Sequence, residues 1–237
     1  MMQRRIVCQL ALCVCILAAT AALADPPAQS NPWEPIESSD PTIGLAARDV
    51  PGQRFREVRG TVTLNAPIAT VASLIDDDTR VRSLLPYALE ASVDRTKGDK
   101  PLLYAWFKGR WPFQKREVYF WVSPRCDAAS HSILVDFQTD NLPSDLPAPK
   151  PSTVRMPTLR GFWKLTPGTQ PNTTDVTYQA YADIGTHGWL GWINNHATPR
   201  LVRQVLYLLR KHATGYTETD LPRLNQHAPQ LFPDCLK

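Results

Sequence analysis

A few charged side chains in this sequence could do chemistry, and their neighbours in the chain limit what that chemistry is. Arg116 and Glu117 are adjacent, so on a strand they point to opposite faces. They either form structural ion pairs at the edge of a sheet or bind a polar group of a ligand. His187 could transfer protons, or it could be an exposed loop histidine. No Gly-x-Ser-x-Gly motif accompanies it, and neither Cys126 nor Cys235 has an evident histidine partner, so nothing indicates a nucleophilic enzyme.

The acidic run Asp76-Asp77-Asp78 resembles a metal motif only superficially. Adjacent carboxylates do not point at one centre, and the spacing and glycine of a calcium loop are missing. Solvated helix capping explains the run. The five histidines are scattered and there is no Cys-x-x-Cys, so we expect no metal and no cofactor.

Cys126 and Cys235 are the cysteines that remain once an N-terminal targeting segment is set aside. In an exported protein two such cysteines could pair, and the bridge would tie the C-terminal tail to the domain. The alternative is that their Cα atoms lie too far apart for a disulfide. The sequence leaves both readings open.

Aromatic residues gather on the faces of several expected strands. Tyr104 and Trp106 are two residues apart and share a face, as do Tyr119 and Trp121. Further apolar bulk comes from Phe137, Met156 and Tyr178. Residues of this kind build either a packed core or an apolar ligand pocket, and the pattern alone allows both.

The composition and the N-terminal segment limit the class of protein to which this chain can belong. The chain has 237 residues, of which 43% are hydrophobic and 20% charged, which is ordinary for a globular protein. Residues 1–24 have the basic start, apolar stretch and Ala22-Leu23-Ala24 end of a cleaved signal peptide, so we expect export to a bacterial periplasm. An uncleaved membrane anchor is the alternative. Loss of Arg4 and Arg5 would lower the formal net charge of +4 by two, which gives no reason to expect a nucleic acid partner.

The order of elements predicts an α+β domain over residues 42–215. Two strands, at 44–49 and 54–64, precede two short helices, the first starting near Asn65-Ala66-Pro67 and the second at 80–85. Strands are then expected at 89–95, 102–108, 116–123, 133–140, 154–165 and 176–183, and an amphipathic helix at 190–214. A curved antiparallel sheet with one long helix on it follows from this order.

The segments around this domain are rich in proline. Residues 25–41 form a leader with a short helix expected near 33–37, whose Trp33 would either cap the core or be a linker aromatic. Residues 141–152 hold four prolines, and we interpret them as a stiff flap over an opening. Residues 216–237 form a polar C-terminal tail.

Several segments carry a resemblance to START lipid-transfer domains, in the helix-grip superfamily that also holds polyketide cyclases. They are Gly44-Leu45-Ala46-Ala47-Arg48, Trp111-Pro112 followed by Arg116-Glu117, Val154-Arg155-Met156, Gly161-Phe162-Trp163-Lys164-Leu165 and Gly188-Trp189-Leu190. The match spans residues 33–214. Glu117 replaces the commoner Asp, which leaves the fold intact and the ligand in doubt.

The resemblance implies a tunnel between the sheet and the C-terminal helix that holds one hydrophobic ligand, such as a sterol, phospholipid, fatty acid or isoprenoid. Lining residues are then expected to be Tyr104, Trp106, Tyr119, Trp121, Phe137, Arg155, Met156, Tyr178, Asp183, Trp189 and Asn194. Arg155 is the expected polar contact, with Asp183 as its partner, because a buried charge needs one. Asn194 and Asn195 either cap the helix or line the tunnel end, and Trp189 and Trp192 either pack or touch a membrane surface.

The resulting function is that of a monomeric, non-catalytic lipid carrier. The alternative is a cyclase-like enzyme in which His187, Tyr119 or Arg155 acts as acid or base. A third reading is an interaction module with a filled core.

Overall fold

The computed structural model describes residues 31–109, 114–186 and 191–214, together with Phe232 and Cys235. The expected signal peptide, His187, Trp189 and most of the expected tail lie outside these residues. In chain order the elements are β1 (Glu34–Ile36), β2 (Gly44–Asp49), β3 (Arg56–Leu64), α1 (Ile68–Asp76), α2 (Val81–Leu84), β4 (Ala88–Asp94), β5 (Leu102–Phe107), β6 (Lys115–Asp127), β7 (Ser132–Gln138), β8 (Thr153–Arg155), β9 (Thr158–Pro167), β10 (Thr174–Asp183) and α3 (Gly191–Thr214).

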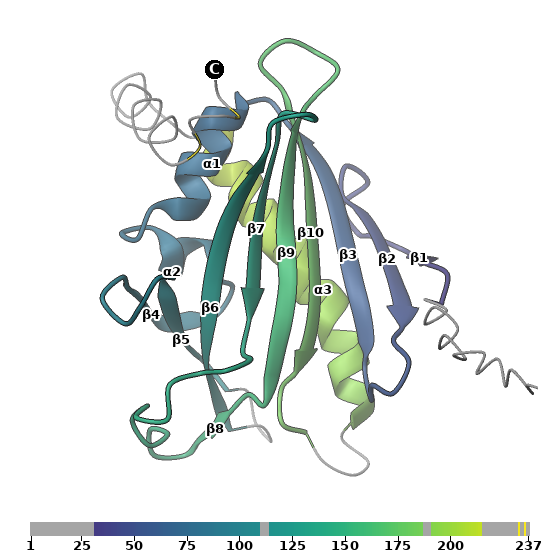
Figure 1. Cartoon of the computed structure of the whole chain (residues 1–237). Coiled ribbons are helices and arrows are strands. Elements are labelled where there is room, and N and C mark those ends of the chain that lie inside the picture. The colour runs from purple at the N-terminus through teal and green to yellow at the C-terminus, as the bar shows by residue number, and fades with distance from the viewer. Residues whose placement is uncertain (1–30, 110–113, 187–190, 215–231, 233–234, 236–237) are drawn as a thin grey trace, which may run out of the picture.

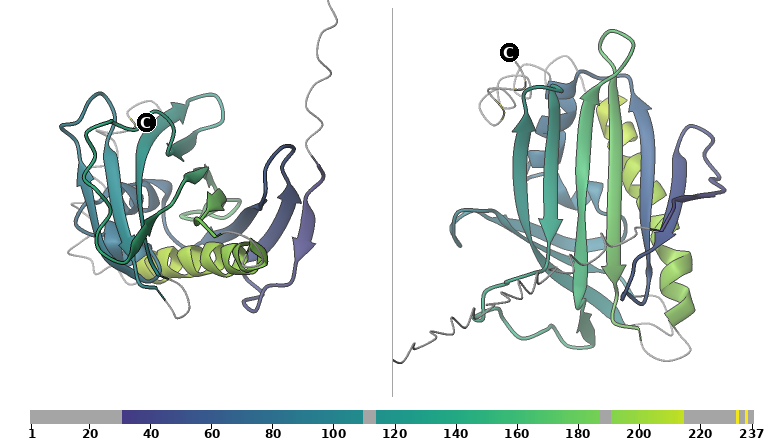
Figure 2. Two further views of the ribbon diagram at one scale, coloured as in Figure 1. Left: turned by 90° about the horizontal axis from the view of Figure 1, so that it is seen from below. Right: turned by 45° about the vertical axis from the view of Figure 1, so that its right-hand side comes forward.

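The strands form one 10-stranded sheet in the order β1-β2-β3-β10-β9-β7-β6-β5-β4, with β8 off this path beside β6. Every pairing is antiparallel except that of β8 with β6, which is parallel. α3 runs obliquely behind the sheet in Figure 1, and the end-on view in Figure 2 shows it lying along one side of the curved strands. The predicted α+β helix-grip architecture is confirmed.

α3 packs on the sheet through a regular apolar stripe. Val202, Val205, Leu206 and Leu209 are buried and follow the 3–4 residue spacing of one helix face. Pro199 lies inside this helix, so the chain forms one helix here rather than starting a second. Gly60 of β3 faces the helix closely: a Cβ there would lie 2.5 Å from Leu206 and 2.8 Å from Val202. Only glycine lets the helix lie this near the strand.

Gly60 identifies the face of the sheet that looks at α3, which we call the inner face. Cross-strand partners share a face, and Gly60 pairs with Tyr178, which pairs with Trp163. Further along the sheet Gly161 pairs with Phe137, and Phe137 pairs with Val122 of β6. Because side chains alternate along a strand, Val122 shares the inner face with Phe120, Val118 and Arg116.

Two local predictions are wrong. Residues 33–37 were expected to be helical, but Glu34–Ile36 form the edge strand β1, where Pro35 is tolerated because an edge strand leaves one side unpaired. Trp33 does not cap the core. Its ring stacks on the guanidinium groups of Arg48 and Arg59.

The strand expected at 154–165 is divided in two. Pro157 lies between β8 and β9, and proline has no N–H to donate to a ladder. The residues before it join β6 in parallel, and the residues after it join β7 and β10. This division decides where Arg155 lies.

A disulfide joins Cys126, at the end of β6, to Cys235, with Cα atoms 5.8 Å apart. Phe232 and Cys235 are both buried and belong to the hydrophobic core cluster. The disulfide therefore fixes Cys235 to the β6–β7 end of the sheet. Among the described residues no helix is long and apolar enough to cross a membrane.

Candidate functional site

A row of aromatic rings crosses the inner face of the sheet. Phe120 meets Phe137 edge-on with ring centroids 5.9 Å apart, and Phe137 stacks on Tyr178 at 5.7 Å. Tyr178 in turn lies 4.2 Å from Trp163. The four rings come from β6, β7, β10 and β9, so the row is built by sheet register and not by one segment.

Two rings of this row, Phe120 and Phe137, are buried, whereas Tyr178 and Trp163 keep accessible surface. Burial raises the pKa of the Tyr178 phenol well above its usual range, which places the ring deep among other groups. The same residue nevertheless keeps accessible surface and is only half-buried. Five further apolar residues next to the core are half-buried in the same way: Phe107, Val122, Met156, Leu159 and Trp163. Surface that is accessible inside a fold is the signature of a lining rather than of a packed core.

Four aromatic residues predicted to line the same space lie on the other side of the sheet. Tyr104 pairs with Tyr119, Trp106 with Glu117, and Leu102 with Trp121, all out of phase with the inner-face residues of β5 and β6. Tyr104 and Tyr119 contact each other there, with centroids 4.7 Å apart. The prediction that Tyr104, Trp106, Tyr119 and Trp121 share a wall with Phe137 and Tyr178 is therefore wrong. They belong to the opposite, outer face.

The outer face carries a buried ion pair that the sequence analysis assigned differently. Glu117 is 1% exposed, and its Oε1 accepts hydrogen bonds from Nε (2.9 Å) and Nη2 (2.6 Å) of Arg155. Asp183, the predicted partner of Arg155, instead accepts a bond from the Gly185 N–H. The parallel pairing of β8 with β6 places Arg155 directly opposite Glu117. This pair is structural and holds β8 on the sheet.

Residues 141–152 cover this outer cluster rather than an opening to the inner face. The Arg155 guanidinium donates to Pro147 O (2.6 Å), Trp121 Nε1 to Asn141 O (3.1 Å), and Lys150 N to Glu117 Oε2 (3.3 Å). Lys150 also pairs with Glu90 and lies over the Trp106 ring. The segment predicted to be a flap is thus fastened to β6 by hydrogen bonds.

The remaining predicted residues have varied surroundings. Met156 packs against the core. Asn194 is fully buried and ties α3 to β10, because it donates to Ala182 O (2.7 Å) and accepts from Ile184 N (3.3 Å). Asn195 accepts from Arg56 N in a similar tie to β3. Trp189 lies outside the described residues, and Trp192 is 56% exposed against His196.

The sequence analysis did not list Phe120 or Trp163 as lining residues, and it left Arg116 open between an ion pair and a ligand contact. Phe120 and Trp163 complete the aromatic row, and Arg116 is the charged residue on the inner face of β6. A signal was present, since Arg116, Val118 and Phe120 alternate in phase. What the alternation could not show is which of the two faces looks at the helix.

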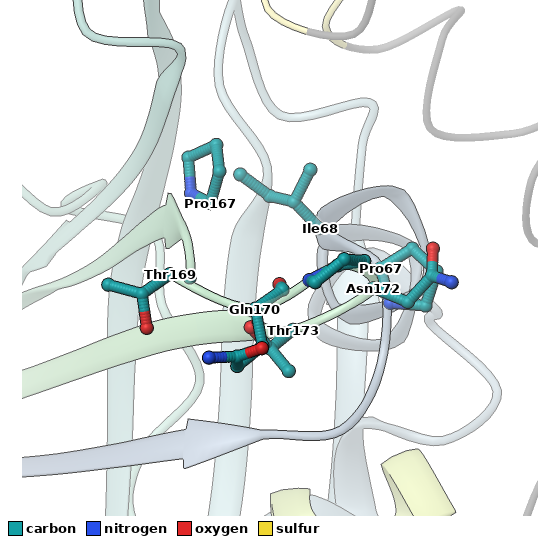
Figure 3. Close-up of a pocket in the computed structure, with 9 residues that line it drawn as sticks. Pro67, Ile68, Pro167, Thr169, Gln170, Asn172 and Thr173 are labelled. Carbon is teal, nitrogen blue, oxygen red and sulfur yellow. The ribbon is translucent and has the colours of Figure 1, made fainter.

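Two surface pockets lie away from the inner face. One, of about 380 Å³, lies between the start of α1 and the β9–β10 turn and is drawn in Figure 3, with Pro67, Ile68, Pro167, Thr169, Gln170, Asn172 and Thr173 labelled. No charged residue lines it. The other, of about 350 Å³, lies on the outer face of the sheet, where Ser123 and Gln179 are among its lining. In the described part of the chain no cluster of His, Cys, Asp or Glu is arranged to hold a metal ion.

Comparison with solved structures gives consistent matches over the whole described domain. The STAR-related lipid transfer protein (fragment 25–204) from Xanthomonas axonopodis is 25% identical, with a TM-score of 0.66 over 77% of this chain and 98% of that chain. Human STARD10 is 16% identical, with a TM-score of 0.68 over 86% of this chain and 81% of that chain. The chain has the START fold. START domains and this chain share the curved sheet and the long C-terminal helix.

Comparison of the sequence with known sequences identifies one relative at low identity. An uncharacterized protein of Pseudomonas aeruginosa is 25% identical over 158 residues, which is 67% of this chain and 75% of that protein. No family model matches the chain. The START fold is thus carried by the arrangement of the elements more clearly than by any single stretch of sequence.

Proposed function

We propose that this protein is a lipid carrier that holds one hydrophobic molecule between the inner face of the sheet and α3. The observation that carries the proposal is the aromatic row from Phe120 to Trp163, in which Tyr178 and Trp163 keep accessible surface on the inner face. Two structures that share its fold are named as lipid transfer proteins, from Xanthomonas axonopodis and from human. The sterol, phospholipid, fatty acid and isoprenoid classes all fit an apolar lining of this kind.

The driving force for loading is the hydrophobic effect. Apolar surface of a lipid costs about 25 cal/mol per Å² in water, and an apolar interior removes that cost without a chemical step. The signal peptide expected at residues 1–24 makes the proposed carrier an exported one, in a compartment where lipids must cross an aqueous layer between membranes.

We propose a carrier rather than an enzyme because the groups available for proton transfer are poorly placed. Tyr119 and Arg155, named as acid or base in the cyclase-like alternative, lie on the outer face. Tyr178 is on the inner face, but its raised pKa keeps the phenol protonated at neutral pH, so it is no general base. His187, the third candidate, lies outside the described residues.

A bulky substitution on the inner face tests the proposal. Val122 is half-buried and lies opposite Phe137, so Val122→Trp would direct an indole into the proposed lipid space. We expect Val122→Trp to reduce lipid loading by about tenfold or more while the protein stays folded, because the indole occupies space that lipid would fill. The measurement is lipid bound per chain after incubation with mixed bacterial lipids, with the melting temperature as the check on folding.

Ser123→Trp is the matched control. Ser123 is the next residue on β6, points to the outer face and lines the outer-face pocket. The same bulk on that side should leave lipid loading unchanged. If Ser123→Trp lost lipid and Val122→Trp kept it, the ligand would belong on the outer face and the proposal would be wrong.

A further inference from the structure

Arg116 is a cation on the inner face of the sheet. It lies opposite Phe107 of β5 on one side and Val154 of β8 on the other. Phe107 packs next to the core, and Val154 lies beside Gly185 after the end of β10. The cross-strand neighbours of Arg116 are therefore apolar, and the residue is on the same side of β6 as Val118 and Phe120.

In the described part of the chain this guanidinium contacts carbonyl groups and no carboxylate. Nε donates to Ile184 O (2.5 Å), and Nη1 donates to Gln114 O (2.8 Å) and Lys115 O (3.3 Å). Within residues 31–109, 114–186 and 191–214, no acidic side chain forms an ion pair with Arg116, and Nη2 donates to no protein atom. Burial lowers the pKa of Arg116, the direction expected when a cation is desolvated without a neutralising partner.

Arg155 on the outer face has a counter-ion, and Arg116 on the inner face differs from it in this respect. Arg155, also partly buried, has Glu117 as a counter-ion at 2.6 Å. A partly buried charge is costly unless it is paired, and the fold meets that requirement for Arg155 but not for Arg116. A ligand that brings its own negative charge would meet it.

The position of Arg116 relative to the aromatic row also fits a ligand with two different ends. Phe120 begins the row four residues along β6, and a strand rises about 3.3 Å per residue, so the Cα atoms of Arg116 and Phe120 are roughly 13 Å apart. Val118, fully buried, is the inner-face residue between them. A charged head at Arg116 would leave the hydrocarbon chain to extend over the inner face towards Tyr178 and Trp163, the two half-buried rings of the row.

We propose that Arg116 binds the anionic head group of the carried lipid, so that the preferred ligands are hydrophobic molecules ending in a carboxylate or a phosphate. The free Nη2 amino group supplies the donor, and the guanidinium plane suits oxyanions of either kind. This inference rests on the proposed lipid-binding function and narrows its ligand class. Sterols and neutral isoprenoid alcohols then become weaker ligands than anionic lipids of equal chain length.

The test compares ligands that share one hydrocarbon chain and differ in the head group. Oleic acid, oleoyl lysophosphatidic acid and oleyl alcohol are each used to displace the neutral probe N-phenyl-1-naphthylamine from the full chain. We expect the wild-type protein to bind one or both anionic lipids about tenfold more tightly than the alcohol. Arg116→Gln should remove that preference and leave the affinity for oleyl alcohol unchanged, while Arg116→Lys should keep part of it.

Lys115→Gln is the matched control, because it removes the same charge from the neighbouring residue, whose ammonium lies over Trp106 on the outer face. It should leave the head-group preference intact.

Inorganic phosphate and acetate alone should displace no probe, and displacement by either would indicate a free-anion site and overturn the inference. Equal binding of all three lipids by the wild type would also overturn it while leaving the carrier function standing. Binding of none of them would contradict the carrier function itself. The wild-type comparison needs no variant, so a folding defect in Arg116→Gln would not block the test.

Discussion

Replacing both Cys126 and Cys235 by serine is expected to lower the melting temperature by roughly 10 °C. The disulfide closes a sequence separation of 109 residues, for which the loss of unfolded-chain entropy corresponds to about 5 kcal/mol of stability. The bridge also keeps Phe232 in the core cluster, near the end of the sheet where β6 turns into β7. Without it, that aromatic ring has only its own packing to hold it in place. Differential scanning calorimetry of the two proteins gives the shift.

Reductant supplies the control for this substitution. Dithiothreitol should lower the melting temperature of the wild type towards that of the double-serine variant and should not affect the variant. A wild type that melts at the same temperature with and without reductant, and at the temperature of the variant, would contradict the role assigned to the bridge.

Gly161→Ala should have the second largest effect, a loss of about 3 kcal/mol of folding stability together with weaker lipid binding. A Cβ at this position of β9 would lie 1.9 Å from the backbone oxygen of Gln179 and 2.7 Å from the ring of Phe137. The first contact is with the neighbouring strand itself, so the ladder between β9 and β10 would have to shift. The second would move Phe137 away from Tyr178 and break the aromatic row.

Urea unfolding of Gly161→Ala measures the first effect, and lipid loading measures the second. Gly44→Ala is a milder companion, since its Cβ would mainly meet the hydroxyl of Thr61, which can rotate. Its stability loss should be clearly the smaller of the two. Comparable losses for both variants would mean that the close approach at Gly161 has no special cost.

The order of elements was predictable from sequence because each element carries a local signal. Alternation located β3 and β10, the Asn65-Ala66-Pro67 segment located the start of α1, and the 3–4 residue spacing from Val202 to Leu209 located α3. The exception in this part was Glu34–Ile36, whose strand depends on pairing with β2 rather than on its own pattern. Local patterns cannot report a partner that is distant in the chain.

The faces of β5 and β6 were not predictable for a related reason. Tyr104 alternates with Leu103 and Ala105, and all three are buried, so neither face of β5 looks solvent-facing in the sequence. Both faces are covered: one by the hydrophobic core, the other by residues 141–152. An alternating pattern shows which residues share a face, but the identity of the covering segment comes only from the three-dimensional arrangement.

The partner of Arg155 was predicted wrongly because residues 154–165 were expected to form one continuous strand. If residues 154–165 formed one strand, Arg155 would approach the end of β10 and Asp183. The break at Pro157 instead sends β8 to β6, where Arg155 meets Glu117, 38 residues earlier in the chain. Arg116, by contrast, is the cation on the inner face of β6 and is therefore the candidate for a polar ligand contact.

Native mass spectrometry of the protein purified from an exporting bacterial host tests the central claim most directly, with organic extraction of any bound material. The account predicts one lipid per chain, enriched in molecules with a carboxylate or phosphate head, and its loss from Val122→Trp. A protein that emerges without lipid and takes up none from mixed bacterial lipids would contradict the claim that the inner face is a lipid-binding surface.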